Sequence, residues 1–200
     1  MKAGLFIPLL LILLAFPVAG QDEAVPEDYE GLLERDDITA RMRGGDLEIT
    51  ATIMDERIVR YATKEMRDYL SKLKEDFLAD NMNYDPDDPK RPIPWLVTFR
   101  ALGQEIRYEP HEVVIYNYGQ EYKPIDIIPV SPAFSSKVTY IRRPPLSAIY
   151  LFDRSIDLNS NELVITYYNA LFFNNWLRVI EKVNEAKTQY EIFRARQEEN

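Results

Sequence analysis

Alternating apolar and polar residues dominate the stretch from Trp95 to Tyr168. Six runs rich in Val, Ile, Tyr or Phe follow one another there, with Pro, Gly, Asn, Asp or Ser between them. A period of two residues is typical of strands that bury one face, and short strands separated by turns are typical of sandwiches and barrels. The predicted strands cover Trp95–Arg100, Glu112–Asn117, Tyr122–Ile128, Lys137–Arg142, Leu146–Phe152 and Glu162–Tyr168.

Two more alternating runs occupy residues 38–43 and 46–53, and Gly44-Gly45 joins them. Because glycine accepts a positive φ without steric cost, we expect a tight hairpin with both glycines at its turn. The apolar face of this hairpin carries Ile38, Ala40, Leu47, Ile49, Ala51 and Ile53. Together with the later strands, it predicts a mainly β (α+β) fold, an immunoglobulin-like antiparallel β-sandwich of about 7–9 strands.

The apolar period changes to three and four residues in two segments, which predicts amphipathic helices over about residues 56–79 and 176–196. Asp55 is the expected N-cap of the first helix, because an Asp side chain accepts hydrogen bonds from free amides. We expect this helix to be inserted between strands and to cover the sheet with Val59, Ala62, Met66, Tyr69, Leu70, Leu73 and Phe77. The second stripe could pack on the sandwich or meet a partner helix, and it holds Trp176, Ile180, Val183, Ala186, Tyr190 and Phe193.

Residues 1–20 have the pattern of a signal peptide, with Lys2, then an apolar run, then small residues. We expect cleavage after Gly20, with retention as an anchor as the alternative. Residues 21–37 are acidic and lack periodicity, which predicts a flexible lead-in. Residues 38–200 are predicted to form a single sandwich domain that contains a Pro-rich loop over residues 80–94.

No later run reaches the roughly 20 apolar residues that a membrane-spanning helix needs. We therefore expect an exported protein, periplasmic or extracellular, with no integral membrane span after signal removal. The chain has no cysteine, so it forms no disulfide. Its net charge of −9 argues against nucleic acid as a partner.

Motifs for several kinds of chemistry are missing from the sequence. The only histidine, His111, is accompanied by no G-x-S-x-G turn, and the chain has no Gly-rich phosphate motif. Two Asx-rich segments, residues 81–87 and 157–161, lack the Gly and Glu of a calcium loop. We therefore expect no cofactor and no metal site, and we assign no catalytic residue.

The 13 tyrosines are the remaining signal, because Tyr is common in strands and is also favoured at interfaces. Tyr118 and Tyr122 flank a predicted hairpin tip, while Tyr190 and Phe193 lie on the distal part of the last helix, so these four are candidate binding residues.

The expected function is that of an exported, non-enzymatic binding or assembly module of the cell envelope, acting through a protein partner. The alternative is a small carboxylate-based hydrolase or a carbohydrate-binding protein on the same β-sandwich scaffold. The 33 acidic residues neither select nor exclude a catalytic carboxylate pair.

Overall fold

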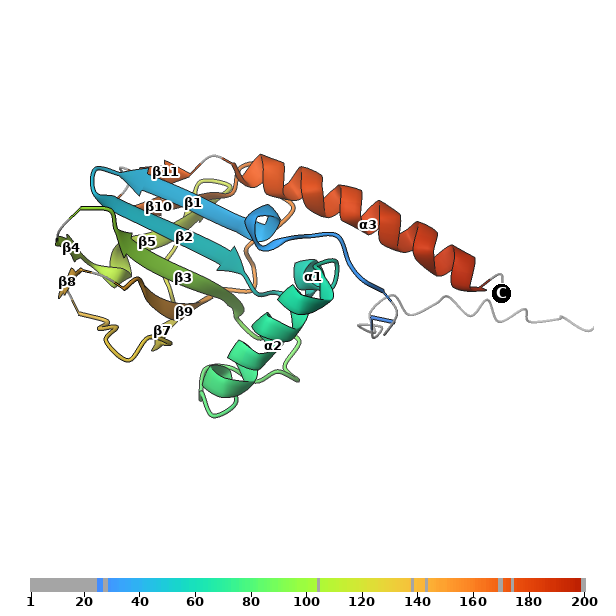
Figure 1. The fold of residues 1–200 in the computed structure, drawn as a ribbon, viewed down its shortest axis with the longest axis horizontal. Coiled ribbons are helices and arrows are strands. Elements are labelled where there is room, and N and C mark those ends of the chain that lie inside the picture. The colour runs from blue at the N-terminus through green and yellow to red at the C-terminus, as the bar shows by residue number, and fades with distance from the viewer. Residues whose placement is uncertain are drawn as a thin grey trace, which may run out of the picture.

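The computed structural model is a mixed α+β fold in which antiparallel sheets are followed by one long C-terminal helix (Figure 1). It describes residues 25–26, 29–103, 105–137, 139–142, 144–168, 171–173 and 175–198. The predicted signal peptide lies outside these residues. No described helix is both long enough and apolar enough to cross a membrane.

The strands form two larger sheets and one small one, and every pairing within them is antiparallel. The five-stranded sheet has the order β1 (Thr39–Gly44), β2 (Leu47–Ile53), β3 (Ile93–Ala101), β9 (Leu146–Phe152), β7 (Asp126–Pro129). The four-stranded sheet has the order β11 (Leu171–Phe173), β10 (Val164–Tyr167), β5 (Val113–Asn117), β6 (Gln120–Tyr122). The small sheet pairs β4 (Ile106–Tyr108) with β8 (Thr139–Ile141).

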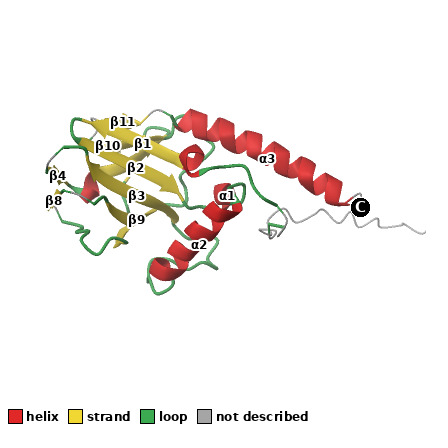
Figure 2. Ribbon diagram, in the orientation of Figure 1, coloured by secondary structure: helices red, strands yellow, loops and turns green. Residues whose placement is uncertain are grey.

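In the described part of the chain, three α-helices lie at one end of the strands, where α3 (Trp176–Glu198) extends well past the sheet (Figure 2). The other two are α1 (Glu56–Val59) and α2 (Lys64–Leu78). Two short 3₁₀ helices complete the fold, η1 (Arg35–Ile38) and η2 (Pro110–Glu112).

The core lies between the two larger sheets, which meet where β1 contacts β11. Trp95 of β3 is fully buried and packs against Trp176 of α3, with ring centroids 5.3 Å apart. The Trp176 indole also donates a hydrogen bond to the Leu158 carbonyl at 3.1 Å. The first turn of α3 is therefore part of the core.

The immunoglobulin-like topology is not confirmed. In that topology the first sheet has the order ABED, so the third strand of the chain belongs to the other sheet. Here the first three strands, β1, β2 and β3, are neighbours in one sheet.

The first hairpin is confirmed, and all six of its predicted apolar side chains are buried. Its turn is displaced by one residue from the prediction. Gly44 pairs with Leu47, so the two turn residues are Gly45 and Asp46 instead of Gly44 and Gly45. Gly45 has a φ of +55°, which is the conformation that glycine supplies at low cost.

The predicted strand over Tyr122–Ile128 is divided between two sheets. It ends at Tyr122 in β6 and resumes at Asp126 in β7, and Pro124 between them has no amide to continue a ladder. Pro94, expected in a loop, is instead part of β3. Its carbonyl accepts a hydrogen bond from the Met54 amide at 3.0 Å, and it stands close to the start of the strand, where a missing donor costs little.

The single helix predicted over residues 56–79 is instead two helices, because α1 ends at Val59. The break is stabilised by a segment that we call the strap, Tyr29–Glu34. The Tyr61 carbonyl accepts hydrogen bonds from two strap amides, those of Leu32 at 2.9 Å and Leu33 at 3.0 Å, so it cannot accept one within a continuous helix. The Thr63 amide in turn donates to the Leu33 carbonyl at 3.0 Å.

Gly31 makes this close approach possible. It has a φ of +78°, and a Cβ built on it would lie 1.8 Å from the Ala62 carbonyl oxygen. The strap itself differs from the flexible lead-in expected over residues 21–37, since Tyr29 and Leu33 are buried in the core.

Candidate functional site

Asp55 is the centre of a charged cluster at one edge of the five-stranded sheet. It lies two residues after the end of β2, caps α1 and is only 4% exposed. Its Oδ1 accepts hydrogen bonds from the Arg57 amide at 2.9 Å and from the Arg57 Nε at 2.8 Å. Its Oδ2 accepts from the Arg57 Nη2 at 3.2 Å and forms an ion pair with Arg154, which follows β9.

The ionised form of Asp55 is favoured in spite of its burial. Burial alone would raise the pKa of this carboxyl, but the hydrogen bonds and charge of Arg57, together with the charge of Arg154, lower it below its usual value. Asp55 is therefore a permanent anion at neutral pH, which suits a positioning role and does not suit a proton donor.

A cavity of about 350 Å³ adjoins this cluster between α2 and the loop over residues 80–92. Charged and polar side chains share its wall with apolar ones. The lining includes Glu56, Ser71, Lys74, Leu78, Tyr84 and Arg91.

Lys74 lines this cavity, and its surroundings lower its pKa. Its side chain is 14% exposed and its ammonium contacts the Glu56 carboxylate. Burial lowers the pKa of Lys74 to about 8, because the opposing effect of Asp55 is weaker and Arg91 lowers the pKa further.

Tyr84 and Arg91 form the opposite wall of this cavity. Burial raises the pKa of the Tyr84 phenol more than the charge and the hydrogen bond of Arg91 lower it, so the phenol stays protonated. The Arg91 Nη1 donates to the Pro86 carbonyl at 2.9 Å, and no ion pair joins Arg91 to a carboxylate among the described residues. The cavity therefore offers an amine, a guanidinium and a phenol to a small ligand.

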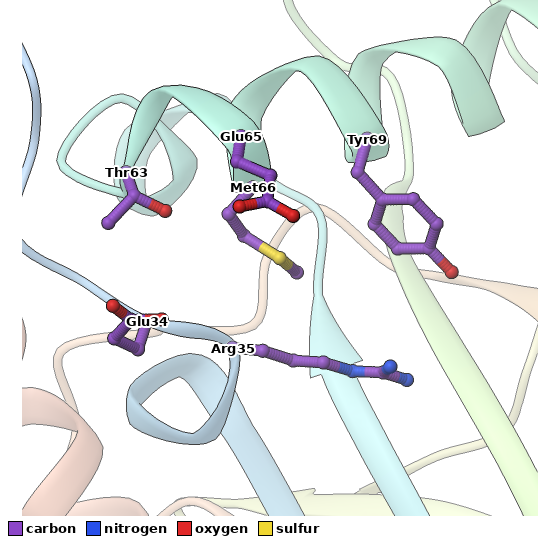
Figure 3. Close-up of a pocket in the computed structure, with 6 residues that line it drawn as sticks. All are labelled: Glu34, Arg35, Thr63, Glu65, Met66 and Tyr69. Atoms are coloured by element: carbon purple, nitrogen blue, oxygen red, sulfur yellow. The ribbon is translucent and has the colours of Figure 1, made fainter.

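A second depression, which we call the strap groove, lies between α2 and the residues around η1 (Figure 3). Its volume is about 300 Å³ and its lining consists of Glu34, Arg35, Thr63, Glu65, Met66 and Tyr69. Figure 3 shows Met66 and Tyr69 projecting from α2 toward the side on which Arg35 extends. Tyr69 is 43% exposed, although the helix pattern predicted that it would cover the sheet.

The four tyrosine and phenylalanine residues selected from the sequence lie in two separate places. Tyr118 is 62% exposed at the β5–β6 turn and donates a hydrogen bond to Asp157 Oδ2 at 3.0 Å, while Tyr122 is half-buried in β6. Tyr190 is buried, with its ring centroid 4.9 Å from that of Tyr29, and Phe193 is 5.3 Å from Tyr29. In this structure, therefore, Tyr190 and Phe193 pack against the strap of the same chain.

Sequence reasoning selected Asp55 only as a helix cap and missed its partner Arg154. A usable signal existed, because β2 and β9 both pair antiparallel with β3 and so run parallel to each other. Their C-terminal ends share one edge, and charged residues follow both strands within two positions, Asp55-Glu56-Arg57 after β2 and Asp153-Arg154 after β9. Once the strand order is known, that pattern predicts a charged cluster there.

Among the described residues, no group of three or more His, Cys, Asp or Glu side chains is arranged to hold a metal ion. The chain matches no protein-family model, no curated protein and no solved structure.

Proposed function

We propose that this protein is an exported, non-enzymatic binding module of the cell envelope that acts through a protein partner bound at the strap groove. The observation that carries the proposal is the exposure of Tyr69 beside Met66 and Arg35 in one depression. Tyr and Arg are enriched among the residues that dominate interface energies, and Met and Arg are enriched at interfaces in general.

The lining of the strap groove suggests what the partner presents. Met66 and Tyr69 offer an apolar floor, whereas Glu34, Arg35 and Glu65 place charges around it. An apolar anchor residue flanked by charged residues of the partner would match this arrangement of a hydrophobic centre with a polar rim. Complementary rim charges would mainly set partner choice and association rate.

Two features support the scaffold and the location in this proposal. The leader pattern of residues 1–20 supports export to the periplasm or the extracellular space. Two antiparallel sheets that meet at β1 and β11 support a β-sandwich as the scaffold.

Three carboxyl groups of the chain lack the raised pKa that carboxylate catalysis requires of its acid. A glycosidase with two carboxylates needs one acid whose pKa is raised. Burial would raise the pKa of Asp55 and of Asp126, but hydrogen bonds and, for Asp55, the nearby arginines outweigh it and lower both values. Hydrogen bonds to Ser155 lower the pKa of Asp153, so none of these three groups suits the role of that acid.

The test is affinity capture from the native host with the wild-type protein and with Tyr69→Ala combined with Arg35→Ala. If the strap groove binds the partner, the double variant should lose it, because losing interface anchors typically costs about 1–3 kcal/mol, or roughly 5- to 150-fold in Kd. Two single variants are the controls. Tyr140→Ala removes another exposed tyrosine, and Tyr118→Ala tests the surface first predicted from the sequence.

Both controls should retain the partner. If capture is lost with Tyr118→Ala and kept with the folded double variant, the β5–β6 turn is the binding surface and the strap groove is not. Circular dichroism should show unchanged folding in each variant, since Tyr69, Tyr118 and Tyr140 are all exposed.

A further inference from the structure

Lys74 differs from an ordinary surface lysine in both position and charge. Its side chain reaches from α2 into the cavity beside the 80–92 loop and is largely buried, whereas Lys72 on the same helix is exposed. Lys182 on α3 shows the opposite behaviour, because its hydrogen bond and ion pair with Glu185 raise its pKa. Desolvation and a neighbouring cation are the two conditions that make a lysine amine nucleophilic, and Lys74 has both.

The groups around Lys74 are suited to a carbonyl chemistry. Glu56 of α1 contacts the amine and its side chain is 42% exposed, so it can exchange protons with water. Arg91 lies across the cavity without an ion-pair partner among the described residues, and a guanidinium of this kind binds carboxylate or phosphate groups well. Glu75 and Tyr84 are the other titratable groups that line the cavity, and the charge of Asp55 also acts on Lys74 and raises its pKa.

We propose that this cavity binds a small aldehyde or ketone that carries an anionic group, and that Lys74 forms a reversible imine with it while Arg91 holds the anion. A cavity of about 350 Å³ suits a ligand of this size, and Leu78, Ala79 and Pro86 can cover its carbon chain. The proposal does not rest on the strap groove, because α2 turns different residues toward the two sites.

The reaction needs no oxidant or reductant. The Lys74 ammonium first gives one proton to water. The lone pair of its Nζ then attacks the carbonyl carbon, and the carbonyl π electrons move to the oxygen, which takes up a proton from water. Glu56 accepts the proton that leaves the nitrogen and returns one to the hydroxyl group of the carbinolamine. Water then departs with the C–O electrons, and a protonated imine remains, which hydrolysis reverses.

The test uses glyoxylate, an aldehyde with a carboxylate, and acetaldehyde, an aldehyde without one. The full chain is incubated with each probe and cyanoborohydride, and peptide mass spectrometry measures the reduced adduct at every lysine. With glyoxylate we expect at least ten-fold more adduct at Lys74 than at Lys72, and a labelling rate that rises with pH around a midpoint near 8. With acetaldehyde the preference should shrink by several-fold.

Two further measurements make the result specific. Arg91→Gln should lower glyoxylate labelling of Lys74 about ten-fold and leave Lys72 unchanged, and Lys74→Arg should remove the preferred adduct. In the wild-type protein, excess acetate should suppress Lys74 labelling, which tests the anion site without any substitution. Equal labelling of Lys74 and Lys72 by glyoxylate, or a preference that neither acetate nor Arg91→Gln reduces, would overturn the proposal.

Discussion

The two ends of α1 attach this short helix to the rest of the molecule by different physics. At its N-terminal end, Asp55 forms ion pairs with Arg57 and with Arg154 beyond β9. Just past its C-terminal end, Tyr61 packs against Tyr190 of α3, which in turn packs against Tyr29 of the strap. A helix of four residues has no stability of its own, so these tertiary contacts determine whether it forms.

We call the end with Asp55, Arg57 and Arg154 the ionic end, and the end with Tyr29, Tyr61 and Tyr190 the aromatic end. The two ends also differ in solvent exposure. The side chains of Arg57 and Arg154 keep 40% and 26% of their exposure, so solvent and salt screen the charges that they present to Asp55. The aromatic end is drier, because Tyr29, Tyr61 and Tyr190 are all buried. We therefore expect the ionic end to respond to acid and salt, and the aromatic end to respond mainly to the loss of side-chain volume.

The largest effect is expected at the aromatic end. Tyr190→Ala should lower the free energy of unfolding by about 3–5 kcal/mol, because it removes a buried ring and leaves a cavity between the strap and α3. Urea denaturation at low and high salt measures this loss, which should be the same at both. Tyr190→Phe keeps the ring and should cost less than about 1 kcal/mol; equal losses in the two variants would contradict the packing argument.

The next effect is at the ionic end. Asp55→Ala should cost about 2–4 kcal/mol, since it removes a helix cap and leaves two arginines without their buried partner. The difference from wild type should shrink in 1 M salt. Asp36→Ala breaks an exposed ion pair with Arg41 and should cost at most about 0.5 kcal/mol, which makes it the matched control.

Lowering the pH should destabilise the protein through the ionic end and not through the aromatic end. The pKa of Asp55 is lower in the folded chain than its usual value of 3.8, so its contribution to stability is complete above that pH. The contribution disappears as the pH falls through the folded pKa. Below pH 4, stability measured by thermal melts should fall more steeply in the wild-type protein than in Asp55→Ala, and Tyr190→Phe should follow the wild type.

The smallest effect comes from Lys74. Because its pKa is about 8 when folded and 10.5 when unfolded, the unfolded chain binds more protons between these values, and stability should rise with pH there. The expected gain from pH 8 to pH 10 is about 2 kcal/mol. Lys74→Met has no amine to titrate, so denaturation curves of that variant should show a smaller rise over the same interval.

Much of the sheet was predictable because its strands bury one face or both. The runs that became β2, β3 and β9 alternate or are wholly apolar, and pairing within one sheet keeps them extended. The break between α1 and α2 was not predictable from periodicity. The pattern from Val59 to Phe77 continues through it, and the hydrogen bonds that keep Tyr61 out of a continuous helix come from the strap, which is distant in sequence.

In the candidate sites, too, features set by local sequence were predictable and features set by distant segments were not. That Asp55 caps a helix could be read locally, and the structure confirms it. The burial of Lys74 could not be predicted from the local sequence, because it depends on where the 80–92 loop folds back over α2. For the same reason Tyr190 looked like a candidate for binding a partner, when Tyr29 covers it within the chain.

The contact between Tyr29 and Tyr190 also has a consequence for how the chain folds. These rings belong to segments separated by most of the described sequence, so a long loop must close before they can meet. Contacts of such high sequence separation slow folding and tend to form late. Until α3 is in place, the strap lacks its aromatic partners and Tyr61 stays uncovered. We therefore expect this corner to be the last part of the molecule to gain protection from hydrogen exchange and the first to lose it.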